Sequence, residues 1–235
     1  MSKIGPITYL KTNLTITVHH LNNSRSQRIL WLLEELGLEY EVKRYERNPA
    51  TMLAPDSLRQ VHPLGKSPVI TDGELTLAES GAIVEYLVER YGDGRLSPLV
   101  GTSERLRYTY WLHYAEGSAM PPLVMQLVFN QVEQQSPFFL RPVAKVITGK
   151  VREAYLQPQI SQQLNYMKAE LKQRTWFASD EFSAADIQMS FPLEAAASQS
   201  NFNEDHPQLK TFLERIHARS AFQKALERGG AYDFA

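Results

Sequence analysis

The sequence contains no cysteine in its 235 residues. This absence excludes disulfide bridges, a cysteine nucleophile and thiolate metal sites. It fits a reducing compartment, and the N-terminal residues lack the charge, apolar stretch and small cleavage residues of a secretory signal. We therefore expect a cytoplasmic protein.

An excess of either charge is also missing, because 25 basic residues face 26 acidic ones and the net charge is −1. Nucleic-acid-binding proteins carry a basic surplus, so we expect no nucleic-acid partner. No apolar run approaches the roughly 18 residues that cross a bilayer, so we expect no membrane association. The six histidines are scattered and no glycine-rich phosphate motif is present, which predicts neither a metal nor a bound cofactor.

The patterns that are present divide the chain into two parts. Residues 14–91 alternate between strand and helix patterns, whereas residues 102–235 show helical periodicity only. Glycine and proline gather in residues 92–101, which we interpret as a linker. We interpret residues 1–13 as an N-terminal extension. The sequence thus predicts an α/β domain followed by an all-helical domain.

The α/β part begins with a strand–helix–strand unit. Residues 14–21 are rich in Thr, Ile and Val and predict a strand. Ser24 and Gln27 form an S-x-x-Q pattern, which predicts a capping box at the start of a helix. Gly37 is expected to end that helix, and residues 40–45 to form a second strand parallel to the first.

A hairpin follows this unit. Two short apolar runs, 68–71 and 74–77, flank Asp72-Gly73, a strong hairpin signal. Pro68 stands at the start of the first run, where its missing N–H matters least. An X–Pro bond also tolerates the cis geometry. A cis Ser67–Pro68 bond would turn the N–H and C=O of Ser67 toward an extended peptide lying alongside.

The next helix begins at Glu79-Ser80-Gly81. Its first turn offers free backbone N–H groups, the hydroxyl of Ser80 and the carboxylate of Glu79. The N–H groups and Ser80 suit an anion, and Glu79 suits a cation. This corner therefore fits a ligand end that carries both a carboxylate and an ammonium group. Ordinary helix capping explains the same residues, and the neighbouring Ser67-Pro68 favours binding.

Four stretches of the chain together resemble the cytosolic glutathione transferases, in the right order and spacing. They are residues 19–28 (HHLNNSRSQR), 62–69 (HPLGKSPV), 77–83 (LAESGAI) and 182–187 (FSAADI). The resemblance implies an α/β thioredoxin-like N-terminal domain and an all-α helical bundle. It is nearest to the bacterial and fungal branch that reads SRxxR at the first helix. It also implies a homodimer with glutathione as co-substrate.

The resemblance places the glutathione sulfur at residues 22–26. A thiol with a pKa of about 8.5 is only a few per cent thiolate at neutral pH, so its activation means stabilising the anion. This loop has neither the tyrosine nor the cysteine of other branches. We expect Ser24 to donate to the thiolate, with the amide of Asn23 as the alternative and Ser26 as a weaker candidate. Ser24 as a plain helix cap stays an open interpretation.

The rest of the site is assigned by the same resemblance. The residues expected to bind glutathione are Ser67, Pro68, Glu79, Ser80, Lys66 and His62. The residues expected to line an electrophile pocket between the domains are Tyr108, Trp111, Tyr114 and Phe129, although aromatic residues at helical spacing also fit a core. Asp186 resembles the buried helix-capping aspartate of the family, with a role in folding.

Three functions are compatible with these residues. The first is a transferase that adds the thiolate of glutathione to a small hydrophobic electrophile. The second is a glutathione-dependent disulfide reductase or peroxidase, which Asn23 in the thiol loop keeps open. The third is a non-catalytic interaction module, which the intact pairs Ser67-Pro68 and Glu79-Ser80 disfavour.

Overall fold

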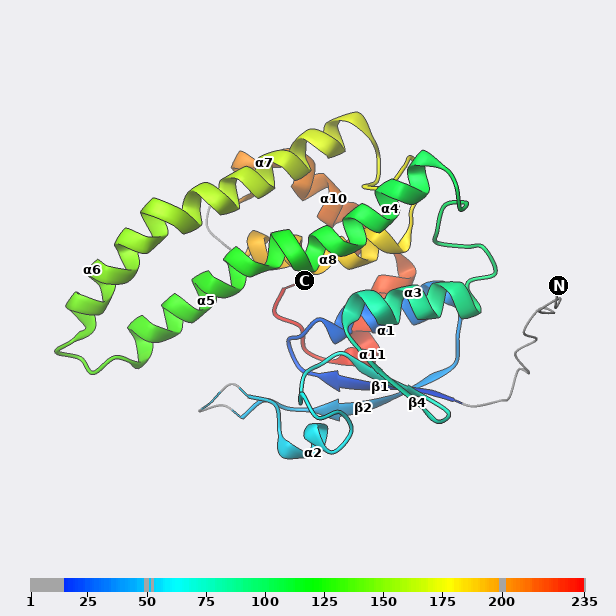
Figure 1. Ribbon diagram of the computed structural model, residues 1–235, viewed down its shortest axis with the longest axis horizontal. Coiled ribbons are helices and arrows are strands. Elements are labelled where there is room, and N and C mark those ends of the chain that lie inside the picture. The colour runs from blue at the N-terminus through cyan, green and yellow to red at the C-terminus, as the bar shows by residue number, and fades with distance from the viewer. Residues whose placement is uncertain (1–14, 49–50, 52, 199–201, 235) are drawn as a thin grey trace, which may run out of the picture.

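The computed structural model describes residues 15–48, 51, 53–198 and 202–234. The predicted extension, residues 1–13, lies outside the described residues. The chain forms a small α/β domain below an all-helical domain (Figure 1). The predicted fold class is therefore confirmed.

The N-terminal domain is a four-stranded sheet in the order β2-β1-β3-β4, with three helices. Strand β1 pairs with β2 in parallel and with β3 antiparallel, and β3 pairs antiparallel with β4. The elements are β1 Ile16–Leu21, α1 Ser26–Leu36, β2 Tyr40–Tyr45, α2 Asp56–Arg59, β3 Val69–Asp72, β4 Leu75–Ala78 and α3 Ser80–Tyr91.

Helix α1 ends as predicted but begins differently. Gly37 adopts the left-handed conformation at φ 67°, which glycine reaches without a Cβ penalty. The capping box of Ser24 and Gln27 is wrong, because α1 starts at Ser26 with no side-chain cap. The hydroxyl of Ser24 instead donates to the carbonyl of Leu21 at 2.7 Å.

The hairpin is confirmed with a shift of one residue. Strand β3 starts at Val69 and β4 ends at Ala78, so the two turn residues are Gly73 and Glu74. Gly73 takes a φ of 61° there. Pro68 has no N–H for the ladder, so pairing starts one position later.

The C-terminal domain contains eight α-helices among the described residues, and two π-helical turns connect four of them into two long rods. Antiparallel helices α5 and α6 extend away from the body as an arm (Figure 1). The elements are α4 Ser103–Tyr114, a π turn Ala115–Ala119, α5 Met120–Gln135, α6 Arg141–Val151, a π turn Arg152–Leu156, α7 Gln157–Gln173, α8 Ala184–Ala197, α9 Phe202–Asp205, α10 Pro207–His217 and α11 Ser220–Gly229.

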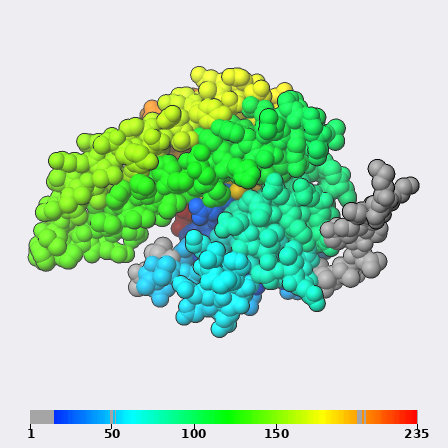
Figure 2. Space-filling view, viewed as in Figure 1, coloured from blue at the N-terminus to red at the C-terminus, as the bar shows by residue number. Residues whose placement is uncertain are grey.

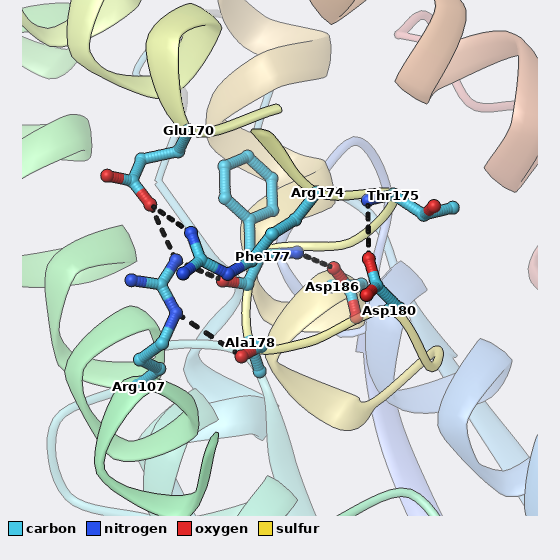
Figure 3. A network of polar contacts seen from close by, with 8 residues as sticks. All are labelled: Arg107, Glu170, Arg174, Thr175, Phe177, Ala178, Asp180 and Asp186. Atoms are coloured by element: carbon cyan, nitrogen blue, oxygen red, sulfur yellow. Dashed lines mark hydrogen bonds and ion pairs between the residues drawn. The ribbon is translucent and has the colours of Figure 1, made fainter. Parts of the chain in front are cut away.

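Helix α8 is the centre of this domain. It is buried nearly all round, as a helix surrounded by others should be. Its capping box is present, with Asp186 accepting from the N–H of Ser183 at 2.9 Å. Asp186 also accepts from the N–H of Phe177 at 2.8 Å (Figure 3). This supports the predicted folding role of Asp186. Arg107 of α4 ties the same loop to α7 through Glu170 at 2.5 Å.

One hydrophobic core joins the two domains. Trp31 of α1 is fully buried and contacts Phe222 of α11 edge-on at 5.2 Å. Helix α11 therefore returns from the end of the chain to pack against the first helix. Within the described parts of the chain, no helix is long and apolar enough to cross a membrane.

Candidate active site

A cleft of about 630 Å³ lies between the domains. Figure 2 shows the hollow between α5 and the N-terminal domain. One side comes from the loop after β1 and from Ser67, and the other from α5, α8 and the C-terminal tail, where apolar side chains alternate with polar ones such as Gln126 and Asn130. The apolar lining residues are Met120, Leu123, Val124, Leu127, Phe191, Ala195 and Phe234.

A second hollow of similar size lies elsewhere. It measures about 610 Å³ and is formed by residues 94–99 and 179–183, together with Arg219 and others. It contains none of the predicted site residues. The cleft that holds Asn23, Ser24 and Ser67 is therefore the candidate site.

Ser24 stands at the polar end of this cleft. It follows the carboxyl end of β1 and precedes the N-terminus of α1, where backbone N–H groups favour an anion. Its Oγ lies 2.7 Å from the carbonyl of Leu21 and 2.8 Å from the Oγ of Ser26. Ser24 thus offers a fixed hydroxyl at the place predicted for the sulfur.

Asn23 is differently occupied. Its backbone takes a φ of 48°, and its side chain faces the C-terminal tail. The Nδ2 donates to the carboxylate of Asp233 at 2.6 Å, and the Oδ1 accepts from the N–H of Asp233 at 2.9 Å. Both ends of the amide are thus held against the tail, and turning this side chain toward the cleft would break both contacts, whereas Ser24 already lines the cleft.

Ser67 comes from the hairpin to the same end of the cleft. The Ser67–Pro68 bond is cis. The Oγ of Ser67 donates to the carbonyl of His19 at 3.0 Å and lies 3.5 Å from the Oγ of Ser24. The structure therefore brings the two predicted serines together.

Glu79 and Ser80 lie beside Pro68 by virtue of the strand register. Val69 pairs with Ala78, so the residues before β3 and after β4 meet at one end of the hairpin. Glu79 is exposed, with a φ of 72°, whereas Ser80 is buried as the first residue of α3. The predicted corner is formed, although neither residue lines the 630 Å³ cleft.

Lys66 and His62 precede this corner in the chain. Lys66 is exposed and His62 is half-buried. The Nδ1 of His62 is buried with no hydrogen-bond partner among the described residues. Neither side chain lines the cleft, so their predicted contact with glutathione stays a prediction.

The predicted electrophile pocket is corrected by the structure. Tyr108, Trp111 and Tyr114 are all buried in the hydrophobic core and none lines the cleft. Trp111 stacks on Tyr166 at 5.5 Å and tilts against Phe177 at 4.6 Å. These aromatic side chains of α4 face inward, so they stabilise the domain and do not wall the cleft.

Phe129 also lies outside the lining residues. The aromatic wall comes from Phe191 of α8 and Phe234 of the tail, whose rings are 5.6 Å apart. Phe191 lies in a segment that reads as core, and Phe234 lies beyond the last helix. Helical periodicity therefore gave no signal that either residue reaches the cleft.

Two arginines at the start of α1, Arg25 at the N-cap and Arg28 in the first turn, pair with an acid of the other domain next to the cleft. Arg25 lies 3.0 Å from Glu116, and the buried guanidinium of Arg28 contacts the same carboxylate. Burial alone raises the pKa of Glu116, but the charges of Arg28 and Arg25 outweigh it and hold that pKa below its usual value. This three-residue contact was not predicted from the sequence.

His20 was missed as well. It is almost fully buried behind the cleft, and its Nδ1 lies 2.8 Å from the Oγ of Ser26. Burial, and then the charge of Arg44, lower the pKa of His20 to about 4, although the backbone of Gly229 acts in the opposite direction. Adjacent residues on a strand face opposite sides, so one of the two histidines, His19 or His20, had to face the helices. This was the only sequence pattern that pointed to His20.

The described residues hold no group of three or more histidine, aspartate or glutamate side chains that could bind a metal ion. The site instead consists of hydroxyl and amide groups beside a cis proline, with an apolar wall opposite. The class that these features define is a two-domain protein with a thioredoxin-like N-terminal domain and a helical C-terminal domain.

Family models place the chain within that class. The glutathione S-transferase N-terminal domain matches residues 15–89, and the C-terminal domain matches residues 123–220. The chain belongs to the glutathione S-transferase family, whose co-substrate is glutathione.

Similar proteins agree with this membership. Glutathione S-transferase 3 of Schizosaccharomyces pombe is 34% identical over 91% of this chain and 87% of its own length. Glutathione S-transferase 1 of Saccharomyces cerevisiae is 32% identical over 92% of this chain and 96% of its own. A crystal structure of a glutathione S-transferase from Actinobacillus pleuropneumoniae has a TM-score of 0.77 at 33% identity, covering 94% of this chain and 95% of that one.

Proposed function

We propose that this protein is a glutathione transferase that stabilises the thiolate of glutathione at Ser24 and adds it to small apolar electrophiles. The observation that carries the proposal is the hydroxyl of Ser24 in a cleft whose other wall contributes seven apolar side chains among its polar ones. A hydroxyl that donates to a thiolate, next to a helix N-terminus, favours the ionised sulfur. The sulfur then forms its bond to carbon as the leaving group departs, and the thiol proton passes to water.

The tripeptide lies along the hairpin in this proposal. Its γ-glutamyl end, with an ammonium and a carboxylate, binds at Glu79 and Ser80, while its middle residue runs beside Ser67 and Pro68. The adjacency of these pairs at one end of β3 and β4 supports that arrangement. The glycyl carboxylate is assigned to Lys66, with His62 on the same edge.

The electrophile occupies the apolar side of the cleft. Leu123 and Leu127 of α5, with Phe191 and Phe234, offer a surface that favours a flat hydrophobic molecule over a charged one. In this proposal the sulfur at Ser24 lies in contact with that surface, because Ser24 lines the same cleft.

Three further assignments belong to the proposal. The SRxxR motif, residues 24–28, assigns the chain to the bacterial and fungal branch, and the yeast and bacterial relatives support it. We place the protein in the cytoplasm as a homodimer. Exposed apolar side chains along α5 and α6, among them Val128, Val132 and Ile147, support an association of two copies.

The test compares three assays on the purified chain. We expect the protein to be retained on glutathione resin and to conjugate glutathione to an aromatic halide. We expect it to reduce a hydroxyethyl mixed disulfide slowly or not at all. Reduction that outpaces conjugation would make the protein a disulfide reductase. Retention without either reaction would make it a binding module, and a failure to bind the resin would remove the glutathione site.

A further inference from the structure

Behind Ser24 a line of polar groups runs into the interior. The Oγ of Ser24 lies 2.8 Å from the Oγ of Ser26, which in turn lies 2.8 Å from the Nδ1 of His20. All three side chains are at least 95% buried: Ser24 is 4% exposed, Ser26 0% and His20 3%. Ser24 nevertheless lines the cleft, so the line connects the cleft with the core.

The direction of these hydrogen bonds follows from counting protons. The carbonyl of Leu21, 2.7 Å from the Oγ of Ser24, can only accept, so it takes the single hydroxyl proton of Ser24. The contact between the serines then requires Ser26 to donate to Ser24. Ser26 has no second proton, so the Nδ1 of His20 must donate to Ser26. No other assignment satisfies all three short contacts.

The surroundings of the ring keep it neutral. Burial, and then the nearby charge of Arg44, lower the pKa of His20 to about 4. At neutral pH the imidazole therefore carries one proton. The backbone of Gly229 also attracts a ring proton, but the three short contacts at Ser24 and Ser26 are all satisfied only when the proton is on Nδ1. The ring is fixed on β1, and Ser26 is fixed as the first residue of α1. The donor thus comes from two rigid elements rather than from a loop.

We propose that His20 is a positioning residue whose Nδ1–H, acting through Ser26, directs the Ser24 hydroxyl toward the glutathione sulfur. This inference rests on the proposed function, in which Ser24 donates to that sulfur. When the thiolate is present, the proton of Ser24 turns from the carbonyl of Leu21 to the sulfur. The oxygen of Ser24 still accepts from Ser26, and a donor chain that points one way strengthens its last bond.

The chain offers a conservative variant and a matched control. His20→Leu removes the donor, whereas His20→Asn keeps an N–H near the position of Nδ1. Ser26→Ala breaks the same line without changing the ring. The control is His19→Leu, since His19 is a neighbour on β1, 5% exposed, and bonds to Tyr45 at 2.9 Å instead of to the serines.

The experiment titrates the ultraviolet absorbance of the thiolate of bound glutathione in each variant at saturating glutathione. His20→Leu and Ser26→Ala should each raise the pKa of the bound thiol by about one unit, which is a tenfold fall in its acid dissociation constant. The double variant should be no worse than either single one, because both act through one line. His20→Asn should retain most of the wild-type value, and His19→Leu should leave it unchanged even where the protein is less stable.

The outcomes separate this inference from the proposed function. If Ser24→Ala weakens the acidity of the bound thiol but Ser26→Ala and His20→Leu do not, the role of His20 is overturned and that of Ser24 stands. If Ser24→Ala has no effect, the proposed role of Ser24 itself fails. Should His20→Leu not fold, Ser26→Ala and His20→Asn decide. A normal titration in Ser26→Ala overturns the inference.

Discussion

At the scale of single residues, the loop after β1 separates two polar side chains that look equivalent in the sequence. The amide of Asn23 makes two hydrogen bonds to Asp233: its Nδ2 donates to the carboxylate at 2.6 Å, and its Oδ1 accepts from the main-chain N–H at 2.9 Å. Ser24 has one proton, which it gives to a main-chain carbonyl at 2.7 Å. A sulfur anion attracts that proton more strongly than a neutral carbonyl does. A bound thiolate can therefore compete for Ser24 without breaking a contact between distant parts of the chain.

The corner formed by Glu79 and Ser80 leads to a prediction about affinity. Ser80→Ala removes a hydroxyl from the proposed carboxylate site, and Glu79→Ala removes the charge that faces the ammonium group. Hydrogen bonds to charged groups are worth about 1.5–3 kcal/mol, which corresponds to roughly ten- to hundredfold in binding. Steady-state kinetics should show such a rise in the glutathione KM of each variant.

A matched control exists for Ser80. Ser103 is also the first residue of a helix, but it is exposed and lies in the other domain. Ser103→Ala should leave the glutathione KM at the wild-type value. If Glu79→Ala and Ser80→Ala also leave it there, the γ-glutamyl end does not bind at this corner.

At the scale of elements, α8 depends on one buried carboxyl group. Asp186 accepts hydrogen bonds from Ser183 and Phe177, and these favour the carboxylate. Burial acts against the charge and prevails, which raises the pKa of Asp186 from 3.8 to about 6. The folded chain therefore holds this proton at a pH where the unfolded chain has lost it.

This shift predicts the pH dependence of stability. A raised pKa in the folded state contributes stability that is complete below about pH 4 and is lost as the pH rises through about 6. Two pKa units correspond to about 3 kcal/mol. The free energy of unfolding of the wild type, relative to that of Asp186→Asn, should fall by about this amount between pH 4 and pH 7 in urea titrations. A difference that grows with pH would mean that the hydrogen bonds outweigh burial.

At the scale of the whole molecule, the two domains share a core and an ion-pair contact. The buried Arg28 of α1 contacts Glu116 in the π turn between α4 and α5, and also donates to the carbonyl of Gln188 in α8 at 2.6 Å. The contact holds α1 against the helices that form the far wall of the cleft. The width of the cleft therefore depends on groups that do not touch glutathione in the proposed arrangement.

Breaking this contact should destabilise the protein. Glu116→Gln removes the counter-ion of a guanidinium that is 1% exposed, which costs about 3 kcal/mol in a fully buried pair. Because Glu116 itself is 32% exposed, water screens part of the loss and about 2 kcal/mol is expected. Chemical denaturation of Glu89→Gln is the control. Glu89 pairs with Arg105 at 3.6 Å on the surface, so a change of at most about 0.5 kcal/mol is expected. Equal losses in the two variants would contradict the role of Glu116.

Features set by short stretches of sequence were predictable. The turn at Gly37, the parallel strands β1 and β2 and the capping box of Asp186 all depend on neighbours in the chain. The box at Ser24 failed because Arg25, and not Ser24, is the N-cap of α1, and the N–H of Gln27 donates to the main-chain carbonyl of Ser24 at 3.2 Å.

Features that join distant residues were not predictable. Asn23 and Asp233 are 210 positions apart, and no local pattern connects them. Periodicity showed that Trp111 and its neighbours share a helix face, but it could not tell whether that face meets the core or the cleft. The same limit hid Phe191 and Phe234 as the aromatic wall.

The most direct measurement is the ultraviolet titration of glutathione bound to the wild type and to Ser24→Ala. The bound thiol of the wild type should titrate at least about one unit below the pKa of about 8.5 of a free thiol. Ser24→Ala should return it toward that value and lower turnover, with little change in glutathione affinity. Identical titrations in the two proteins would show that the Ser24 hydroxyl does not stabilise the thiolate.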